Sequence, residues 1–188
     1  MVPDPQRVII TRPGMTAHWG VDPSTKRIAV AGQIHVFAQV ATHSFPETDG
    51  LARLGDIYDG TCEFVRDLLV SWDAPGFVMV EQPSGTNVDP ILWYAVGTII
   101  TAMQNTLAEE VGSPRMETIA PASWKKVAVG RGNLYKPTRK KLGRTPVFLD
   151  YGVAQWAEQN GYRGSSWDEA DALGIAEAAR RLVRLEAR

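Results

Sequence analysis

The sequence contains a single cysteine, Cys62, in 188 residues. No disulfide can therefore form within the chain, and a cluster of thiolate metal ligands is excluded. Long apolar segments are also missing, since no run approaches the ~20 residues that span a bilayer. The N-terminal residues, with Asp4 and Arg7 before the short apolar run at residues 8–10, do not form a signal-peptide pattern. These absences predict a cytoplasmic protein with no membrane partner and no redox chemistry.

Acidic residues are absent between Thr118 and Leu149, although the chain carries 21 of them and a net charge of −1. This segment contains eight basic residues, whereas the rest of the chain has 12 basic residues against all 21 acidic ones. The eight are Lys125, Lys126, Arg131, Lys136, Arg139, Lys140, Lys141 and Arg144. A positive segment on an otherwise acidic protein favours binding of a polyanion at one surface. A solvated loop whose lysines serve solubility is the alternative.

We assign no functional role to the histidines or the tryptophans. The histidines show no ligand spacing and are interpreted as ordinary strand or loop residues: His18, His35 and His43. The tryptophans are predicted to lie in the core and not to stack on bases, especially Trp19, Trp93 and Trp124. Asp150 is predicted to be a surface position of a helix.

The rest of the sequence alternates segments typical of strands and helices. Short β-rich or apolar runs bounded by turn residues predict strands at residues 16–22, 27–32, 34–41, 77–80 and 116–119. Apolar periodicity and end signals predict helices at residues 51–72, 90–111, 121–129 and 145–159, and a last helix opened by a Ser166/Glu169 capping box. This order predicts a single α/β domain over residues 1–188. Its mixed sheet would have three antiparallel strands followed by parallel strands, flanked by helices, as in the ribonuclease H-like architecture.

Four acidic residues lie where a structural role alone does not explain them: Asp22, Glu81, Asp168 and Asp171. Asp22 and Glu81 each end a predicted strand, and the two strands are expected to be adjacent and central. Asp168 and Asp171 are three residues apart in the first turns of a helix and so share a face. Mg²⁺ prefers oxygen ligands, and two such ions ~3.5–4 Å apart activate water and stabilise a leaving alkoxide. The set therefore predicts hydrolysis of phosphodiesters.

Two of the four acidic residues also have a simpler explanation. Asp22 could only form a turn with Pro23 and Ser24, and Asp168 could only favour a helix N-terminus. Asp171 lies in a small-residue stretch expected to be buried, and Glu81 follows four apolar residues. A buried carboxylate is costly without a cation partner, so the four together favour a metal site.

Four short motifs occur in an order found in one known family. They are Trp19-Gly-Val-Asp-Pro-Ser24, Val80-Glu-Gln82, Ala120-Pro121 with Lys125, Gly130, Gly132 and Lys136, and Asp168-Glu-Ala-Asp-Ala-Leu-Gly-Ile-Ala176. In combination they resemble the RuvC family of Holliday junction resolvases over most of the chain. The resemblance implies a ribonuclease H-like fold, a homodimer, and Mg²⁺-dependent nicking of branched DNA that leaves 5′-phosphate and 3′-hydroxyl ends.

The resemblance also assigns roles to the site residues. The four acidic residues would be the catalytic carboxylates and would bind two Mg²⁺ ions, for which Mn²⁺ can substitute. Lys125 and Lys136, at the lysine positions of the motif, would contact the scissile strand or stabilise its charge.

The glycines of the basic segment support a role in DNA binding. Gly130 and Gly132 let the backbone approach phosphates closely and adopt positive φ. A plain helix stop followed by a turn explains them equally well. The predicted DNA contacts are Lys125, Lys126, Gly130, Arg131, Gly132, Lys136, Arg139, Lys140, Lys141 and Arg144.

Departures from the family leave the substrate open. The position after Asp22-Pro23, commonly glycine, is Ser24, and residues 82–87 lack the aromatic residue with which the family can wedge into a junction. The extended basic stretch from Lys136 to Arg144 could broaden the substrates from four-way junctions to forks and flaps. Divergent relatives of this kind are often encoded by bacteriophages, in which case the protein would act in the host cytoplasm.

The sequence thus predicts a Mg²⁺-dependent, structure-selective DNA endonuclease, a crossover junction endodeoxyribonuclease. A branched-DNA-binding protein of the same fold that does not cut is the alternative hypothesis. A third hypothesis is an actin-like ATP-binding fold. It requires phosphate loops rich in Gly and Thr, and these do not follow Asp22.

Overall fold

The computed structural model describes residues 17–34, 37–84 and 89–186 of the chain. The predictions that concern residues 1–16, His35 and residues 85–88 lie outside this description. None of the helices within the described ranges combines the length and the apolarity needed to cross a membrane.

The fold is built on a five-stranded mixed sheet with the strand order β3-β2-β1-β4-β5. Its strands are β1 (Ala17–Pro23), β2 (Arg27–Ile34), β3 (Phe37–Ser44), β4 (Pro75–Glu81) and β5 (Arg115–Ile119). β1, β2 and β3 form an antiparallel meander, whereas β4 runs parallel to β1 and to β5. This order of antiparallel and then parallel strands confirms the predicted α/β mixed sheet, with β1 in its centre.

The hairpin between β2 and β3 differs from the prediction. The sequence predicts that the third strand runs from Ile34 to Ala41, but Ile34 ends β2 and β3 continues to Ser44. Strand-forming residues are nearly continuous from residue 27 to residue 44, so composition alone does not locate the turn.

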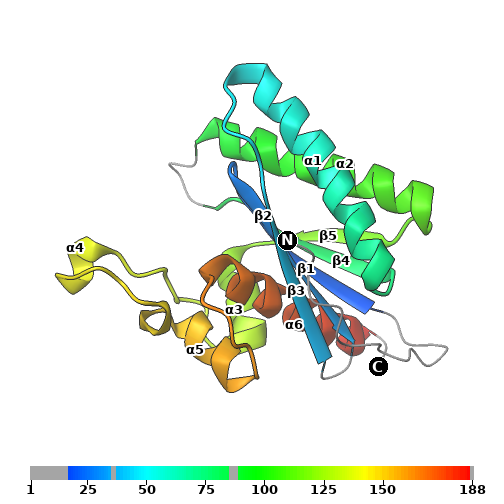
Figure 1. Ribbon diagram of the computed structural model, residues 1–188. Helices are drawn as coiled ribbons and strands as arrows, with labels where there is room; N and C mark the ends of the chain where they lie inside the picture. The colour runs from blue at the N-terminus through cyan, green and yellow to red at the C-terminus, as the bar shows by residue number, and fades with distance from the viewer. Residues whose placement is uncertain (1–16, 35–36, 85–88, 187–188) are drawn as a thin grey trace.

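Helices cover both faces of the sheet (Figure 1). One face carries α1 (Gly50–Ser71) and α2 (Pro90–Glu110), and the other carries α3 (Pro121–Val129), α5 (Gly152–Gln159) and α6 (Trp167–Glu186). Side chains of β4 alternate between these layers. Val78 and Val80 pack with α1 and α2, whereas Phe77 and Met79 pack with α3, α5 and α6. All four are buried, as an uninterrupted apolar run predicts for a strand covered on both faces.

Proline and glycine mark helix ends where the sequence predicts them. Pro90 starts α2 behind Asp89, whose carboxylate accepts a backbone N–H of the first turn at 3.0 Å. Pro121 starts α3, which ends at Gly130 with a φ of 86°. That left-handed conformation suits glycine and stops the helix.

The predicted helix over residues 145–159 is wrong in its first half. The chain instead forms a short 3-10 helix, η1 (Phe148–Asp150), and α5 begins only at Gly152. The carboxylate of Asp150 accepts hydrogen bonds from the guanidinium of Arg144 at 2.6 and 2.7 Å and from a backbone N–H at 2.8 Å. Asp150 is thus tied to the preceding loop and is not the predicted surface position of an α-helix.

The tryptophans divide between core and surface. Trp19 and Trp124 are fully buried, as predicted. Trp93 is 50% exposed, so its predicted core position is wrong. It lies in the first turn of α2, whose buried side begins with Ala95, Val96 and Ile99, and helical periodicity turns Trp93 away from that side.

The last helix lies so close to the central strand that position 20 has no room for a side chain. A Cβ atom on Gly20 would overlap the backbone nitrogen of Ala176 and the backbone oxygen of Ala172 in α6. Ala170 and Ala179 of the same helix are also fully buried. Glycine and alanine thus bring the backbone of α6 directly against β1.

Candidate active site

The ends of β1 and β4 place two acidic side chains next to each other. Val21 of β1 pairs with Val80 of β4, so Asp22 and Glu81 are the next residues on two adjacent parallel strands. The carboxyl ends of parallel strands form the edge at which α/β sheets bind ligands. Two of the four predicted site residues therefore lie at this edge.

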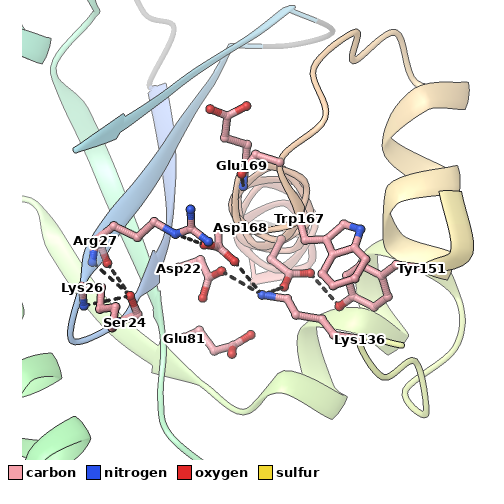
Figure 2. A network of polar contacts seen from close by, with 12 residues as sticks. Asp22, Ser24, Lys26, Arg27, Glu81, Lys136, Tyr151, Trp167, Asp168 and Glu169 are labelled. Carbon is pink, nitrogen blue, oxygen red and sulfur yellow. Dashed lines mark hydrogen bonds and ion pairs between the residues drawn. The ribbon is translucent and has the colours of Figure 1, made fainter. Parts of the chain in front are cut away.

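The first turns of α6 add the other two acids. Asp168 opens the helix and Asp171 follows one turn later, with only 2% of its surface exposed. The close packing of α6 on Gly20 carries this turn to the end of β1. Figure 2 shows the side chains of Asp22, Glu81 and Asp168 directed toward one centre. The structure thus brings all four predicted carboxylates together from three elements.

Lys136 places its ammonium group at that centre (Figure 2). Its Nζ atom lies 2.8 Å from Asp168 Oδ1, 2.9 Å from Asp171 Oδ2 and 3.6 Å from Asp22 Oδ2. The lysine comes from an irregular segment more than thirty residues before α6. A predicted lysine of the motif is therefore in direct contact with the predicted carboxylates.

Burial dominates the electrostatics of three of the acids. It raises the pKa of Asp22 well above its ordinary value and also raises the pKa of Glu81 and of Asp171. The positive charge of Lys136 opposes this effect at each of the three. Carboxylates with raised pKa values are ones for which additional positive charge is favourable.

The pKa values of Asp168 and Lys136 are shifted in the directions that favour their charged forms. Burial acts to raise the pKa of Asp168, but the hydrogen bond and charge of Lys136, with the charge of Arg27, outweigh it and the pKa is lowered. Burial acts to lower the pKa of Lys136, but the charges of Asp22 and Asp171 and the contact with Asp168 raise it. Lys136 is therefore a protonated ammonium ion at neutral pH.

Two buried aromatic side chains orient the acids by hydrogen bonds. Trp124 donates its indole N–H to Glu81 Oε2 at 2.5 Å, and Tyr151 donates its hydroxyl to Asp171 Oδ1 at 2.7 Å. Both aromatic side chains are fully buried, so the oxygens that they contact are held in place. The sequence predicts Trp124 only as a core residue and does not single out Tyr151, because no local spacing links either donor to its distant acid.

The turn between β1 and β2 supplies another cation. Arg27 forms an ion pair with Asp168, and the sequence prediction misses it. Ser24 closes the turn, since its Oγ accepts the N–H of Arg27 at 3.1 Å and that of Lys26 at 3.3 Å. Serine in place of the family's usual glycine is thus accommodated. The position of Arg27 just across a tight hairpin from Asp22 is the signal that could have found it.

Lys125 lies inside this cluster. It is 8% exposed, and its ammonium group lies 5.1 Å from the ring centre of Trp124 and 5.7 Å from that of Tyr151. Its charge acts to lower the pKa of Glu81 and of Asp171, against the larger effect of burial. This placement suits stabilisation of charge at the site better than contact with a DNA surface.

The other predicted DNA contacts lie along the segment from Lys126 to Arg144. Lys136 is exposed but contacts the acids, and the other exposed cations are Lys126, Arg131, Arg139, Lys140, Lys141 and Arg144. The short helix α4 (Arg139–Leu142) has no buried residue and projects away from the sheet (Figure 1). These cations are therefore available to a polyanion, except that Arg144 is paired with Asp150 at 2.6 Å.

The two glycines predicted to contact DNA have structural explanations. Gly130 is the left-handed residue that ends α3. A Cβ atom at Gly132 would come within 2.8 Å of the backbone oxygen of Ala122, so this position packs closely against α3. The helix stop that the sequence left open as an alternative is thus the role of Gly130.

The fold matches solved structures of resolvases. RuvC from Thermus thermophilus aligns over 91% of this chain and 97% of its own length, with 20% identity and a TM-score of 0.56. The fold is RuvC-like. T. thermophilus RuvC in complex with Holliday junction substrate aligns over 90% of this chain and 96% of its own, with 18% identity and a TM-score of 0.56. The yeast mitochondrial Holliday junction resolvase aligns over 92% of this chain and 81% of its own length, with 16% identity and a TM-score of 0.51.

Sequence comparison adds nothing to this likeness, since no family model and no curated protein matches the chain. The structural matches cover nearly the whole of this chain and of T. thermophilus RuvC. They bear out the predicted ribonuclease H-like fold and the resemblance to RuvC at the level of the fold.

The donor set of this site fits a divalent metal ion. It offers only carboxylate oxygens, the ligands that Mg²⁺ prefers, and three of the four acids are in surroundings that favour added positive charge. Within the described ranges, no three acidic, histidine or cysteine side chains are arranged as the shell of one metal ion. The ammonium group of Lys136 lies among the acids instead.

Proposed function

We propose that the chain is a metal-dependent, structure-selective endonuclease that cuts branched DNA, as a crossover junction endodeoxyribonuclease does. The observation that carries the proposal is the convergence of four carboxylates from β1, β4 and α6 at the ligand-binding edge of a RuvC-like sheet. A carboxylate cluster of this kind is costly to bury without cations, so a role in stability does not explain it.

In the proposed reaction, two Mg²⁺ ions, for which Mn²⁺ would substitute, would be held by Asp22, Glu81, Asp168 and Asp171. When bound, these ions supply an activated water and stabilise charge on the phosphate and on the leaving oxygen. The hydrogen bonds of Trp124 and Tyr151 hold one oxygen of Glu81 and one of Asp171 in place. Lys125 adds a fixed positive charge at the same place. The products carry 5′-phosphate and 3′-hydroxyl ends.

Branched DNA is the substrate that the basic segment and the fold favour together. The exposed cations between Lys126 and Lys141 give the protein a surface for phosphates, while the rest of the chain is acidic. The solved complex of T. thermophilus RuvC with Holliday junction substrate supports a four-way junction as the first candidate. The projecting α4 extends the surface, which supports forks and flaps as further substrates.

We further propose a homodimer, because two symmetric cuts in one junction require two sites. The faces of α1 and α2 that point away from the sheet are the proposed contact. Light scattering at micromolar concentration should give the mass of a dimer, and the mass of a monomer would contradict paired nicking.

The test is a cleavage assay with purified protein, Mg²⁺ and end-labelled DNA. Four-way junctions, forks, flaps and linear duplex are compared, and the cut sites are mapped. We expect cleavage of branched DNA, at least 10²-fold slower for Asp22→Asn and Glu81→Gln because each variant loses a charged metal ligand. Cleavage unaffected by these substitutions would overturn the site. Junction binding in Ca²⁺ or EDTA without product in Mg²⁺ or Mn²⁺ would instead favour the protein that binds but does not cut.

A further inference from the structure

The ammonium group of Lys136 is the cation of the carboxylate cluster. Two of its contacts, with Asp168 and Asp171, are at hydrogen-bonding distance, and the third, with Asp22, is an ion pair at 3.6 Å. An ammonium group has three donors in a compact charge, and here they meet oxygens from two different elements. The carboxylates thus surround a cation as they would in an ion-binding site, but the cation is a side chain of the protein.

A metal ion that bound the three carboxylate oxygens contacted by Lys136 would compete with its ammonium group for the same space. Mg²⁺ binds oxygen at ~2.0–2.1 Å, so an ion on the same carboxylate oxygens would lie where the Nζ atom now makes its contacts. We propose that Lys136 is the resident counter-ion of the site and that a divalent metal ion binds by displacing its ammonium group. The inference rests on the proposed function for the kind of ion that enters.

Lys136 is built to leave the cluster. Its side chain is 39% exposed, whereas that of Asp171 is 3% exposed and that of Asp22 is 11% exposed. The lysine lies in residues 133–138, which form neither helix nor strand, and its four-carbon stem is flexible. The cation can therefore swing toward solvent or toward a bound phosphate while the acids stay in place.

The cluster has a second cation that does not need to move. The backbone of Arg27 is held at the start of β2, and from there its side chain pairs with Asp168 without the help of Lys136. The departure of Lys136 therefore uncovers mainly Asp22 and Asp171, the two least exposed of the acids that it contacts. These are the oxygens that an incoming metal ion would bind.

If a metal ion displaces the ammonium group, removing that group should have opposite effects on metal binding and on stability. Removal of the ammonium group relieves the competition, so the metal-free protein should bind a divalent ion more tightly. The same removal leaves the acids without their counter-ion, so the protein should be less stable when no metal is present. A lysine that served only the structure, or that assisted metal binding, would not combine tighter metal binding with lower metal-free stability.

The experiment compares Lys136→Met with Lys26→Met in the full-length protein without DNA. Lys26 is an exposed lysine on the turn beside the site, and its ammonium group pairs with Glu47 at 3.8 Å. It therefore controls for the loss of one positive charge. Mn²⁺ binding is measured by electron paramagnetic resonance, and thermal unfolding is followed in EDTA and in Mn²⁺.

We expect the Mn²⁺ Kd of Lys136→Met to fall at least tenfold and that of Lys26→Met to stay within twofold of wild type. The Tm of Lys136→Met in EDTA should fall below that of wild type and should rise more on addition of Mn²⁺. Lys136→Arg, which keeps the charge, should bind Mn²⁺ no more tightly than wild type. Lys136→Gln provides the same test if the methionine variant does not fold.

The outcomes separate this inference from the proposed function. Equal or weaker Mn²⁺ binding by folded Lys136→Met, in a wild type that binds Mn²⁺, overturns displacement and leaves the nuclease standing. Tighter binding without cleavage of any branched DNA supports displacement and overturns the nuclease. Absence of Mn²⁺ binding in wild type and variants alike overturns both.

Discussion

The face of the sheet under α1 and α2 is packed by large aliphatic and aromatic side chains, whereas the face under α6 is packed largely by alanine. Ile57, Ile99 and Leu107 are fully buried on the first face, and none of the predicted site residues packs there. On the second face, Gly20 and the alanines of α6 let two backbones meet. Large side chains bury more apolar surface, and small ones allow closer approach. Burial of large side chains stabilises the first face, while the close approach of α6 to β1 on the second face positions acids.

The largest effect should come from a side chain at the closest approach of the second face. Gly20→Val places atoms onto the backbone of Ala172 and Ala176, so α6 must shift and carry Asp168 and Asp171 away from Asp22. We expect a loss of more than ~3 kcal/mol in unfolding free energy, because backbone atoms cannot yield as a side chain can. A shift of ~1 Å should also slow cleavage by ~10²-fold or more.

Chemical denaturation and the cleavage assay measure these two effects. Gly97→Ala in α2 is the matched control, because nothing lies within 4 Å of a Cβ atom at that position. It should stabilise the helix by ~0.5–1 kcal/mol and leave cleavage unchanged. If Gly20→Val had the cleavage rate and stability of wild type, the position of α6 would not depend on its close approach to Gly20.

A cavity in the first face should lower stability and spare the site. Ile99→Ala removes a fully buried side chain between α2 and the sheet, so it should cost ~2–5 kcal/mol in unfolding free energy. At a temperature where the variant stays folded, its Mn²⁺ affinity and cleavage rate should match wild type. Gln104→Ala, at an exposed position of the same helix, should change stability by less than ~0.5 kcal/mol.

If Ile99→Ala weakened Mn²⁺ binding in the folded protein, the two faces would be coupled, and the division between a stabilising face and a positioning face would fail. Calorimetric titration of Ile99→Ala and Gln104→Ala with Mn²⁺ measures whether the two faces are coupled.

The second face is also fastened by charge, which predicts a smaller effect that depends on pH. Glu177 of α6 accepts hydrogen bonds from Gln33, Arg180 and Arg181, and Arg181 also donates to the backbone oxygen of Val127 at 2.8 Å. Burial acts to raise the pKa of Glu177, but these donors outweigh it and lower the pKa to about 2.

A lowered pKa in the folded state means that the ionised form stabilises the protein. The contribution of Glu177 is therefore fully present above its ordinary pKa of 4.5 and is lost as the pH falls toward about 2. Urea unfolding at pH 5 and at pH 3 should show a steeper loss of stability in wild type than in Glu177→Gln. Glu63→Gln, on the exposed side of α1, should follow wild type. Equal losses of stability in wild type and Glu177→Gln would show that the charge of Glu177 does not stabilise this face.

The parts of the fold that the sequence predicts well are those set by local physics. Phe77 to Val80 is uninterrupted because β4 is covered on both faces, and the run identifies a central strand. Pro121 and Gly130 mark the ends of α3 because each fits only one end of a helix. Asp22 and Glu81 stand out because each follows an apolar strand, so local contrast also reveals half of the candidate site.

Features that depend on distant contacts escape the sequence. Tyr151 interrupts a predicted helix and points to Asp171, and only the tertiary structure shows this hydrogen bond. The motif indicates Lys136 as a charge near DNA, but its contact with the acids depends on the path of an irregular segment. Trp93 is apolar, yet its place on the first turn of α2 leaves it half exposed. For Tyr151 and Lys136 the deciding partner lies far away in the chain, whereas Trp93 depends on where the buried side of α2 begins.

The projecting helix α4 has a consequence for how proteins of this kind can diverge. None of its residues is buried, so its sequence and length are not constrained by the packing of the sheet. Each doubling of a flexible loop costs only ~0.6 kcal/mol in closure entropy. Insertions and deletions near residues 139–142 should therefore be nearly neutral for folding. Natural selection can then change the reach of the basic segment while the carboxylate cluster is inherited intact.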